Sequence, residues 1–285
     1  KLEQMRALKM SSLFLIATLT ISGCTAAEEE PVATATPSPV VTQEPEPEPE
    51  PIYVTAALTG VEYLEGENLF LELPAISAKI DNTSAGRPQL ALNDADIVYV
   101  TRVEVGLTRL LPVWHSRMPE AIGPVRSVRP VDAAIVDPFH GVFVYSGGQV
   151  PFKSAATRTG LVISDEDTEM NNDTYFREST RKAPWNLFFR SQSLQELYSE
   201  EQPVPQAGFA FDLISTAVGE GVVANGLSVN YPQMKSAWDL GTGNFPWAMG
   251  LQTAWLRSQD GTPHIQFGGD QVAAKNVVVM EVVHD

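Results

Sequence analysis

A proline- and glutamate-rich segment near the N-terminus limits which part of this chain can fold. Residues 24–51 contain seven prolines and end in four consecutive Glu-Pro pairs that begin at Glu44. The segment has little apolar surface to bury, and its prolines and like charges favour an extended, semi-rigid chain of at most roughly 80 Å. We interpret it as a tether, with a ligand for a proline-binding module as the alternative. The folded body is therefore expected to begin near Ile52.

The residues before the tether resemble the signal peptide of a bacterial lipoprotein. Three basic residues lie within residues 1–9, and an apolar run from Met10 to Ile21 follows them. The run is too short to span a bilayer comfortably but suits a signal-peptide core. It ends in Ile21-Ser22-Gly23-Cys24, which resembles a lipobox and implies cleavage before Cys24. We therefore predict a signal peptide over residues 1–23 and an extracytoplasmic body anchored to the cell membrane through lipidated Cys24. The alternative is a chance cysteine after a signal peptide or a short membrane anchor.

The charge distribution narrows the kinds of partner that the body can have. The formal net charge is -16, which argues against nucleic-acid binding because that function needs a basic face. From Lys79 to Arg129, however, seven Lys and Arg residues stand against five Asp and Glu residues, which makes a local positive island. Cys24 is the only cysteine, which excludes a disulfide within the chain, and no motif indicates a metal or another cofactor.

The expected elements define an α+β fold in two parts. We predict a mixed α/β domain over residues 52–205 and a smaller, mostly β domain over residues 206–285. In the first domain we expect strands near residues 73–82, 95–100, 107–115 and 141–145, and short helices over residues 132–136 and 191–200, the latter with a serine cap. In the second we expect short strands at residues 209–213, 226–231, 237–240, 253–257, 263–267 and 275–283. Because the chain ends just after the most apolar of these, we expect the second domain to be truncated.

Several ordered blocks resemble one known family. The blocks are Lys79-Ile80-Asp81-Asn82, Ala85-Gly86-Arg87-Pro88-Gln89, Ala95-Asp96-Ile97-Val98-Tyr99, Gly106-Leu107-Thr108-Arg109, Ile122-Gly123-Pro124-Val125-Arg126-Ser127-Val128-Arg129-Pro130, Gly147-Gly148 and Arg181-Lys182-Ala183-Pro184. They are similar to the N-terminal domain of the YerB-like lipoproteins of Gram-positive bacteria, which carry a DUF3048 domain of unknown function. The residues around Trp255, His264 and Lys275 resemble the family's smaller C-terminal β domain. The resemblance implies a lipoprotein at the cell envelope and supplies no reaction; Trp185 stands where the family often has a histidine.

Arginines from these blocks form the best candidate for a binding site. The segment Gly123 to Pro130 places Arg126 and Arg129 between two prolines, which indicates a pair of fixed guanidinium forks. The predicted ligand-binding residues are Arg87, Arg109, Arg126, Arg129, Arg181, Lys182, Asp81, Asn82 and Glu104, and Arg102 and Arg177 belong to the wider set. Their partner is either an external anion of a cell-wall polymer or envelope protein, or the chain's own carboxylates in an internal ion-pair network.

Two other patterns bear on catalysis, and only the first suits it. Asp94 and Asp96 face one side at the start of a strand, which suits cation binding or glycoside chemistry, although such a run is also typical of a turn. Ser146-Gly147-Gly148 lacks the pattern of a nucleophile turn, and neither His115 nor His140 can be assigned as its base.

The second domain is rich in aromatic residues. Trp238, Trp247 and Trp255 form either a platform that stacks on carbohydrate or part of the core. Taken with the arginines, the sequence predicts a non-catalytic binding or scaffolding protein at the envelope. The alternative is a hydrolase of wall polysaccharide or peptide that uses Asp81, Asp96 or Glu104 as acid or base.

Overall fold

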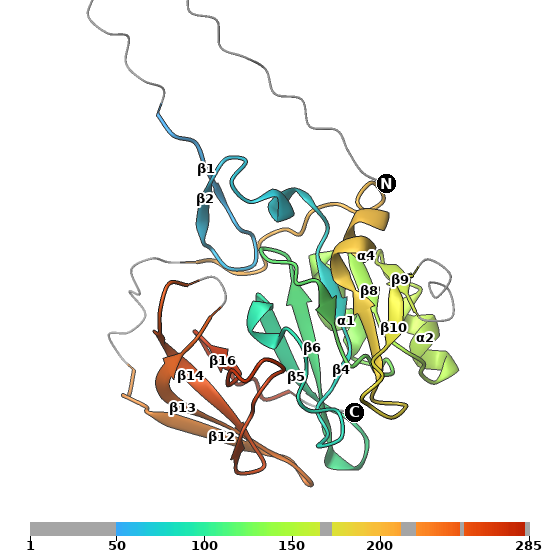
Figure 1. Cartoon of the computed structure of the whole chain (residues 1–285), viewed down its shortest axis with the longest axis vertical. Coiled ribbons are helices and arrows are strands. Elements are labelled where there is room, and N and C mark those ends of the chain that lie inside the picture. Colours follow the sequence, from blue (N-terminus) through green and yellow to red (C-terminus); the bar gives the residue numbers. More distant parts are fainter. Residues whose placement is uncertain (1–49, 166–172, 212–220, 246–247, 283–285) are drawn as a thin grey trace, which may run out of the picture. The chain divides into compact units, whose positions relative to one another are not determined.

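A six-stranded mixed sheet forms the centre of the first part of the fold (Figure 1). The computed structural model describes residues 50–165, 173–211, 221–245 and 248–282. The strands of this sheet are β3 (Ile76–Ala78), β4 (Ile80–Asp81), β5 (Ile97–Arg102), β6 (Thr108–Trp114), β8 (Val142–Val144) and β9 (Val162–Ser164). Their order is β4-β6-β3-β8-β9, with β5 also paired to β6. The β3–β8 and β8–β9 pairs are parallel, and the others are antiparallel.

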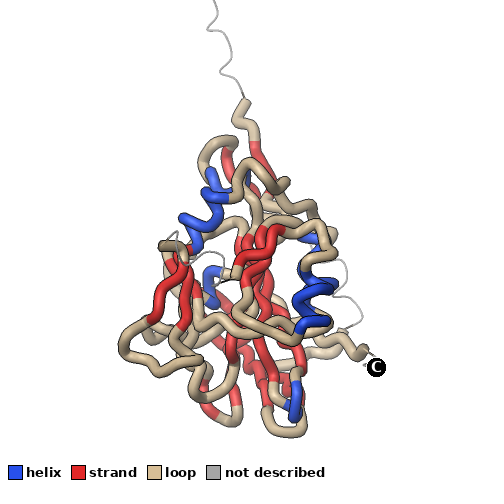
Figure 2. Tube along the Cα trace, turned by 90° about the vertical axis from the view of Figure 1, so that its right-hand side faces the viewer, coloured by secondary structure: helices blue, strands red, loops and turns tan. Residues whose placement is uncertain are grey.

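Both faces of this sheet are buried, because side chains that alternate along its strands enter two different core clusters. Ile76 and Leu110 belong to one core cluster, whereas Leu111 and Phe143 belong to the other. Short helices lie beside the strands in Figure 2. They are α1 (Asp132–Val136), α2 (Val150–Ala156) and α4 (Ser191–Leu197), with 3-10 turns η1 (Leu69–Glu72), η2 (Leu92–Asp94), η3 (Glu104–Gly106) and η4 (Asp137–Phe139).

The predicted serine cap of α4 is wrong. Arg190 occupies the cap position and makes no side-chain cap hydrogen bond. Ser191 is the first helical residue, and its hydroxyl donates to the carbonyl oxygen of Pro119 instead. The Ser191 hydroxyl therefore donates to a distant carbonyl oxygen instead of accepting a local backbone N–H, as a capping serine would.

Two small sheets complete the first part. One is three-stranded, in the order β10 (Tyr175–Arg177), β11 (Leu187–Arg190) and β7 (Ala121–Ile122). The other is the hairpin of β1 (Tyr53–Thr55) and β2 (Glu62–Leu64). The mixture of sheets and separate short helices confirms the predicted α+β class.

The second main sheet is antiparallel throughout. It consists of β12 (Gly226–Asn230), β13 (Lys235–Gly243), β14 (Gln252–Gln259), β15 (Thr262–Pro263) and β16 (Ala273–Ala274). Side chains of the first part hydrogen-bond to it: Asn82 Nδ2 lies 3.2 Å from Gln259 Oε1, and the backbone N–H of Asn93 lies 3.1 Å from Gln266 Oε1. The predicted domain boundary at residue 205 stays a prediction.

Three strand predictions in this region differ from the structure. Residues 275–282 form no strand, and Val278 is 80% exposed. Their apolar composition predicts a strand only if a sheet edge receives them, and β16 ends at Ala274. The strand expected over residues 263–267 is limited to Thr262–Pro263. Residues 209–211 form no strand, and the rest of that prediction lies outside the described residues.

The described residues contain no helix that is both long and apolar enough to cross a membrane.

Candidate functional site

The loop from Gly123 to Pro130 is fixed by backbone hydrogen bonds on both sides. The N–H of Arg126 donates to Lys79 O at 2.8 Å, and the N–H of Val128 donates to Gly147 O at 3.1 Å. The Gly123–Pro124 peptide bond is cis. The loop therefore lies between strand β4 and the turn after β8, and its arginines are held by the backbone rather than extending from a free loop.

Arg126 is directed toward Asp81, which is almost completely buried. Arg126 Nε lies 2.8 Å from Asp81 Oδ2, although its N–H does not point at the carboxylate well enough for a hydrogen bond. The other carboxylate oxygen of Asp81 accepts the backbone N–H and the hydroxyl of Thr83, both at 2.6 Å. Gly86 makes this packing possible, because a Cβ there would lie 2.6 Å from the Asp81 carboxylate.

Arg129 is paired with a more exposed carboxylate. Its Nε lies 2.6 Å from Glu104 Oε1, and the Glu104 side chain is 52% exposed. Burial raises the pKa of the Glu104 carboxyl, but hydrogen bonding and charge from Arg129 outweigh it, so that the pKa lies below its ordinary value. Arg129 Nη1 also donates to Val128 O at 2.9 Å.

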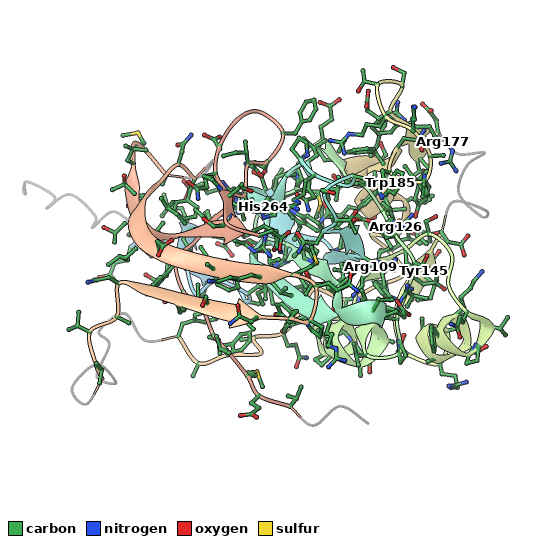
Figure 3. All side chains as sticks on the ribbon, turned by 90° about the horizontal axis from the view of Figure 1, so that it is seen from below. Arg109, Arg126, Tyr145, Arg177, Trp185 and His264 are labelled. Carbon is green, nitrogen blue, oxygen red and sulfur yellow. The ribbon has the colours of Figure 1, made fainter. Side chains whose placement is uncertain are left out.

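Arg109 lies on β6, and Figure 3 shows its label close to that of Arg126. Its Nη1 donates to Ser127 O at 2.7 Å, and Arg129 Nη1 reaches the same oxygen at 3.3 Å. No carboxylate of a described residue lies within ion-pair distance of Arg109. Burial, followed by the charges of Arg129 and Arg126, lowers the pKa of its guanidinium to about 10.

We call Arg109, Arg126 and Arg129 the arginine cluster. Among the described residues, Asp81 and Glu104 are the carboxylates within ion-pair distance of it, and the nearby Asp132 is paired with Lys79. The three guanidinium groups are therefore left with one positive charge in excess. Five of the predicted residues therefore come together here. The arrangement combines internal ion pairs with an uncompensated cation, and so contains elements of both alternatives that the sequence leaves open.

The other predicted residues lie elsewhere. Arg87 and Asn82 turn toward the second sheet, where Arg87 Nη2 lies 3.2 Å from Asp260 Oδ2. Arg181 donates to the carbonyl oxygens of Gly86 and Pro88, at 3.2 and 2.5 Å. Lys182 is exposed. These side chains hold loops together or face solvent, and the structure does not join them to the arginine cluster.

The two aspartates considered for acid–base or metal chemistry have different surroundings. Asp96 is buried and accepts the backbone N–H groups of His115 and Ser116 at 2.8 and 2.7 Å. Asp94 is partly exposed, and burial raises the pKa of its carboxyl despite the nearby Arg117. Within the described ranges, no three His, Cys, Asp or Glu side chains gather closely enough to hold a metal ion.

The aromatic residues of the second sheet are divided between core and surface. Trp238 is 8% exposed and lies 5.6 Å from the Arg257 guanidinium carbon, measured to its ring centre. Phe245 is also buried, Trp255 is half-buried, and Trp247 lies outside the described residues. Trp238 therefore serves packing, as the core interpretation predicts.

A buried polar junction between the two main sheets was missed by the sequence reasoning. Arg257 Nη2 donates to Gln259 Oε1 at 2.6 Å, and Arg257 Nη1 contacts His264 Nδ1. His264 Nε2 lies 2.7 Å from Gln89 Oε1, and Gln89 Nε2 donates to Asp81 O at 2.7 Å. Because an arginine only donates, His264 accepts at Nδ1 and carries its proton on Nε2. Burial, followed by the charges of Arg257 and Arg87, lowers the pKa of His264 to about 2.

A comparison with known protein families identifies the family of this chain. Residues 58–204, slightly more than half of the chain, match the family described as the N-terminal domain of a protein of unknown function (DUF3048). The chain belongs to this family, which confirms the resemblance in its sequence blocks.

Two comparisons with the YerB protein of Bacillus subtilis, one of sequence and one of structure, add to this result. The protein named "Putative lipoprotein YerB" of strain 168 is 30% identical over 133 residues, which cover 47% of this chain and 39% of that protein. The match thus spans about two fifths of the relative's length. The crystal structure of the YerB protein shares the fold with a TM-score of 0.61 at 21% identity, over 77% of this chain and 72% of that one. None of these descriptions assigns an activity.

Proposed function

We propose that this protein is a lipid-anchored, extracytoplasmic binding protein that holds an anionic partner at the arginine cluster without catalysing a reaction. The observation that carries the proposal is the arginine cluster itself: three guanidinium groups approach one another, and two carboxylates are available to them. Arg109 has no carboxylate partner among the described residues. A phosphate or carboxylate group would supply the missing negative charge and accept the planar fork of an arginine.

The location at the envelope is supported by the leader and the tether. The lipobox-like Ile21-Ser22-Gly23-Cys24 precedes an extended segment that would hold the body away from a membrane. The name of the Bacillus relative, "Putative lipoprotein YerB", agrees with this arrangement. At a bacterial envelope, the anionic partner would be a wall polymer or an acidic surface of another envelope protein.

A binding role is better supported than hydrolysis of wall polysaccharide or peptide. Each of the three carboxylates that the hydrolase alternative names lies within ion-pair distance of an arginine: Asp81 of Arg126, Asp96 of Arg117 and Glu104 of Arg129. Asp81 and Asp96 are also buried, where they could not reach a polymer.

The test is the affinity of the purified protein for soluble poly(glycerol phosphate), measured by calorimetry at low and high salt. Arg109→Gln should weaken binding about tenfold or more, because a charge-assisted contact is lost. Arg109→Lys should restore part of it. The matched control is Arg158→Gln, an exposed arginine after α2. Equal affinities for Arg109→Gln and Arg158→Gln, with both variants folded, would contradict the proposal.

A further inference from the structure

A hollow of about 370 Å³ lies where the loop after β4 meets the residues around β15. Ser84, Arg87 and Pro88 line one side, and Pro263, His264 and Ile265 line the other. Its volume is in the range of sites that bind small molecules. The hollow shares no lining residue with the arginine cluster, so it constitutes a separate candidate site.

One donor in this hollow is available to a ligand. Arg87 Nη2 contacts Asp260 and Arg87 Nε donates weakly to Thr83 O at 3.4 Å. Arg87 Nη1 makes no hydrogen bond to a described residue. The Arg87 side chain is 17% exposed, so its guanidinium lies at the surface of the hollow with one edge unoccupied.

The charge behind the hollow is not balanced. Arg257 is 4% exposed, and no carboxylate of a described residue lies within ion-pair distance of it. His264 separates Arg257 from the hollow and is neutral, because it accepts from Arg257 through Nδ1. Arg87 and Arg257 therefore share one nearby carboxylate, Asp260, which leaves one positive charge in excess. A buried excess charge attracts an anion more strongly than an exposed one does.

The opposite side of the hollow is apolar. Pro263 offers an aliphatic ring on this side, and Ile265 is 40% exposed although it is a large hydrophobic residue. The hollow thus places an apolar surface next to a cationic donor. This combination suits a ligand that has a carboxylate at one end and an aliphatic group at the other.

We propose that this hollow binds a small carboxylic acid with an apolar side chain, with its carboxylate on Arg87 and its aliphatic group against Pro263 and Ile265. Asp260 competes with the ligand for the same guanidinium. Binding a ligand here is an additional function, independent of the arginine cluster.

N-acetyl-leucine is a suitable probe, titrated against the purified protein and followed by calorimetry. N-acetyl-leucine amide, which lacks the carboxylate, should bind about tenfold more weakly or worse, and Arg87→Gln should have a similar effect. Ile265→Ser should weaken binding several-fold. Asp260→Asn should tighten it, because the competing carboxylate is gone; a merely structural role for Arg87 would not produce opposite changes in these two variants.

Two outcomes would overturn the proposal. One is equal affinity for the acid and the amide, and the other is the absence of saturable binding to a wild-type protein that is folded by its thermal transition. Arg109→Gln is the control variant, and it should leave N-acetyl-leucine binding unchanged. Loss of polymer binding in that variant with retention of N-acetyl-leucine binding would separate this site from the proposed function.

Discussion

Lys79, in the first main sheet, and Arg257, in the second, are both buried cations, but their surroundings differ. Lys79 Nζ lies 2.5 Å from Asp132 Oδ1 and 2.7 Å from Thr101 Oγ1, and both charged side chains are fully buried. Arg257 is surrounded by Gln259, Ser236, His264 and the ring of Trp238, all of them neutral. The first sheet neutralises its buried charge, whereas the second disperses it.

The difference follows from the shapes of the two cations. An ammonium group is a compact charge that one carboxylate can match, while a planar guanidinium can distribute its donors over several acceptors and stack on an aromatic ring. Burial lowers the pKa of Lys79, and the charge and hydrogen bond of Asp132 oppose that effect. Burial, followed by the charge of Arg87, lowers the pKa of Arg257 to about 10, so Arg257 remains protonated at neutral pH.

Asp132→Asn should have the largest effect on stability, because it leaves Lys79 buried without a counter-charge. Breaking a buried pair on one side costs about 3–5 kcal/mol. The measurement is urea unfolding at neutral pH. The loss should shrink as the pH is raised. Without Asp132, the pKa of Lys79 in the folded variant lies well below its unfolded value of 10.5, so the unfolded chain binds more protons than the folded one. The stability of the variant therefore rises with pH.

The exposed Asp239 on β13 supplies the matched control for this substitution. Asp239→Asn should change stability by no more than about 0.5 kcal/mol. The double variant Lys79→Met with Asp132→Leu should recover most of the loss, since an apolar pair of similar size can replace a buried ion pair. If Asp132→Asn were as mild as Asp239→Asn, Lys79 would not depend on neutralisation.

His264→Asn tests the dispersed charge of the second sheet. In the folded protein the pKa of His264 is about 2, whereas it is 6.5 in the unfolded chain. As the pH falls below 6.5, the unfolded state binds a proton that the folded state excludes. The free energy of unfolding therefore decreases with falling pH until the pH approaches 2. At about pH 5 the wild-type protein should have lost about 2 kcal/mol from this group relative to neutral pH.

The side-chain amide of the His264→Asn variant can still accept from Arg257 but cannot be protonated. The stability of the variant, measured by urea unfolding at both pH values, should therefore fall less than that of the wild-type protein. Parallel pH profiles for the two proteins would show that His264 titrates normally and that Arg257 does not hold it neutral. The exclusion of the proton distinguishes this junction from the paired charge of Lys79.

Local patterns in the sequence predicted the first sheet better than the second. The helix at Asp132–Val136 has its predicted bounds, since Pro130 just before it marks its start. Strands β5 and β6 follow from runs of β-branched and apolar residues. The run at residues 275–282 has the same composition but forms no strand, because a strand also needs a partner that composition does not reveal.

Sequence patterns also predicted only part of the candidate sites, because the partners of a residue in space are not visible in its local sequence. Arg126 and Arg129 could be predicted as a pair because they share one short loop. The hydrogen bond from Arg109 to Ser127 O, which brings Arg109 to this loop across 18 residues, depends on how β6 packs beside it. The contact between Gln89 and His264 spans 175 residues, and neither residue belongs to a recognisable spacing. Only the folded chain brings these groups together.

Asp260→Asn should change stability less than the substitutions at Asp132 and His264, because Asp260 belongs to an exposed charge pair rather than a buried one. The pair between Asp260 and Arg87 is partly exposed, with side-chain exposures of 38% and 17%. Such a pair contributes at most about 1 kcal/mol.

The substitution should preserve the local backbone. Asp260 has a φ of 55°, and asparagine tolerates that conformation. The Oδ1 of asparagine can also still accept the N–H of Lys235, as Asp260 does at 2.8 Å. The substitution therefore removes the charge and the acceptor of Arg87 Nη2, and leaves the turn intact. Urea unfolding should show a small loss at low salt that disappears at high salt, because salt screens exposed charges. A loss that persists at high salt, or that matches Asp132→Asn, would mean that this pair behaves as a buried one and that the charge of Arg257 is neutralised through Asp260 rather than dispersed.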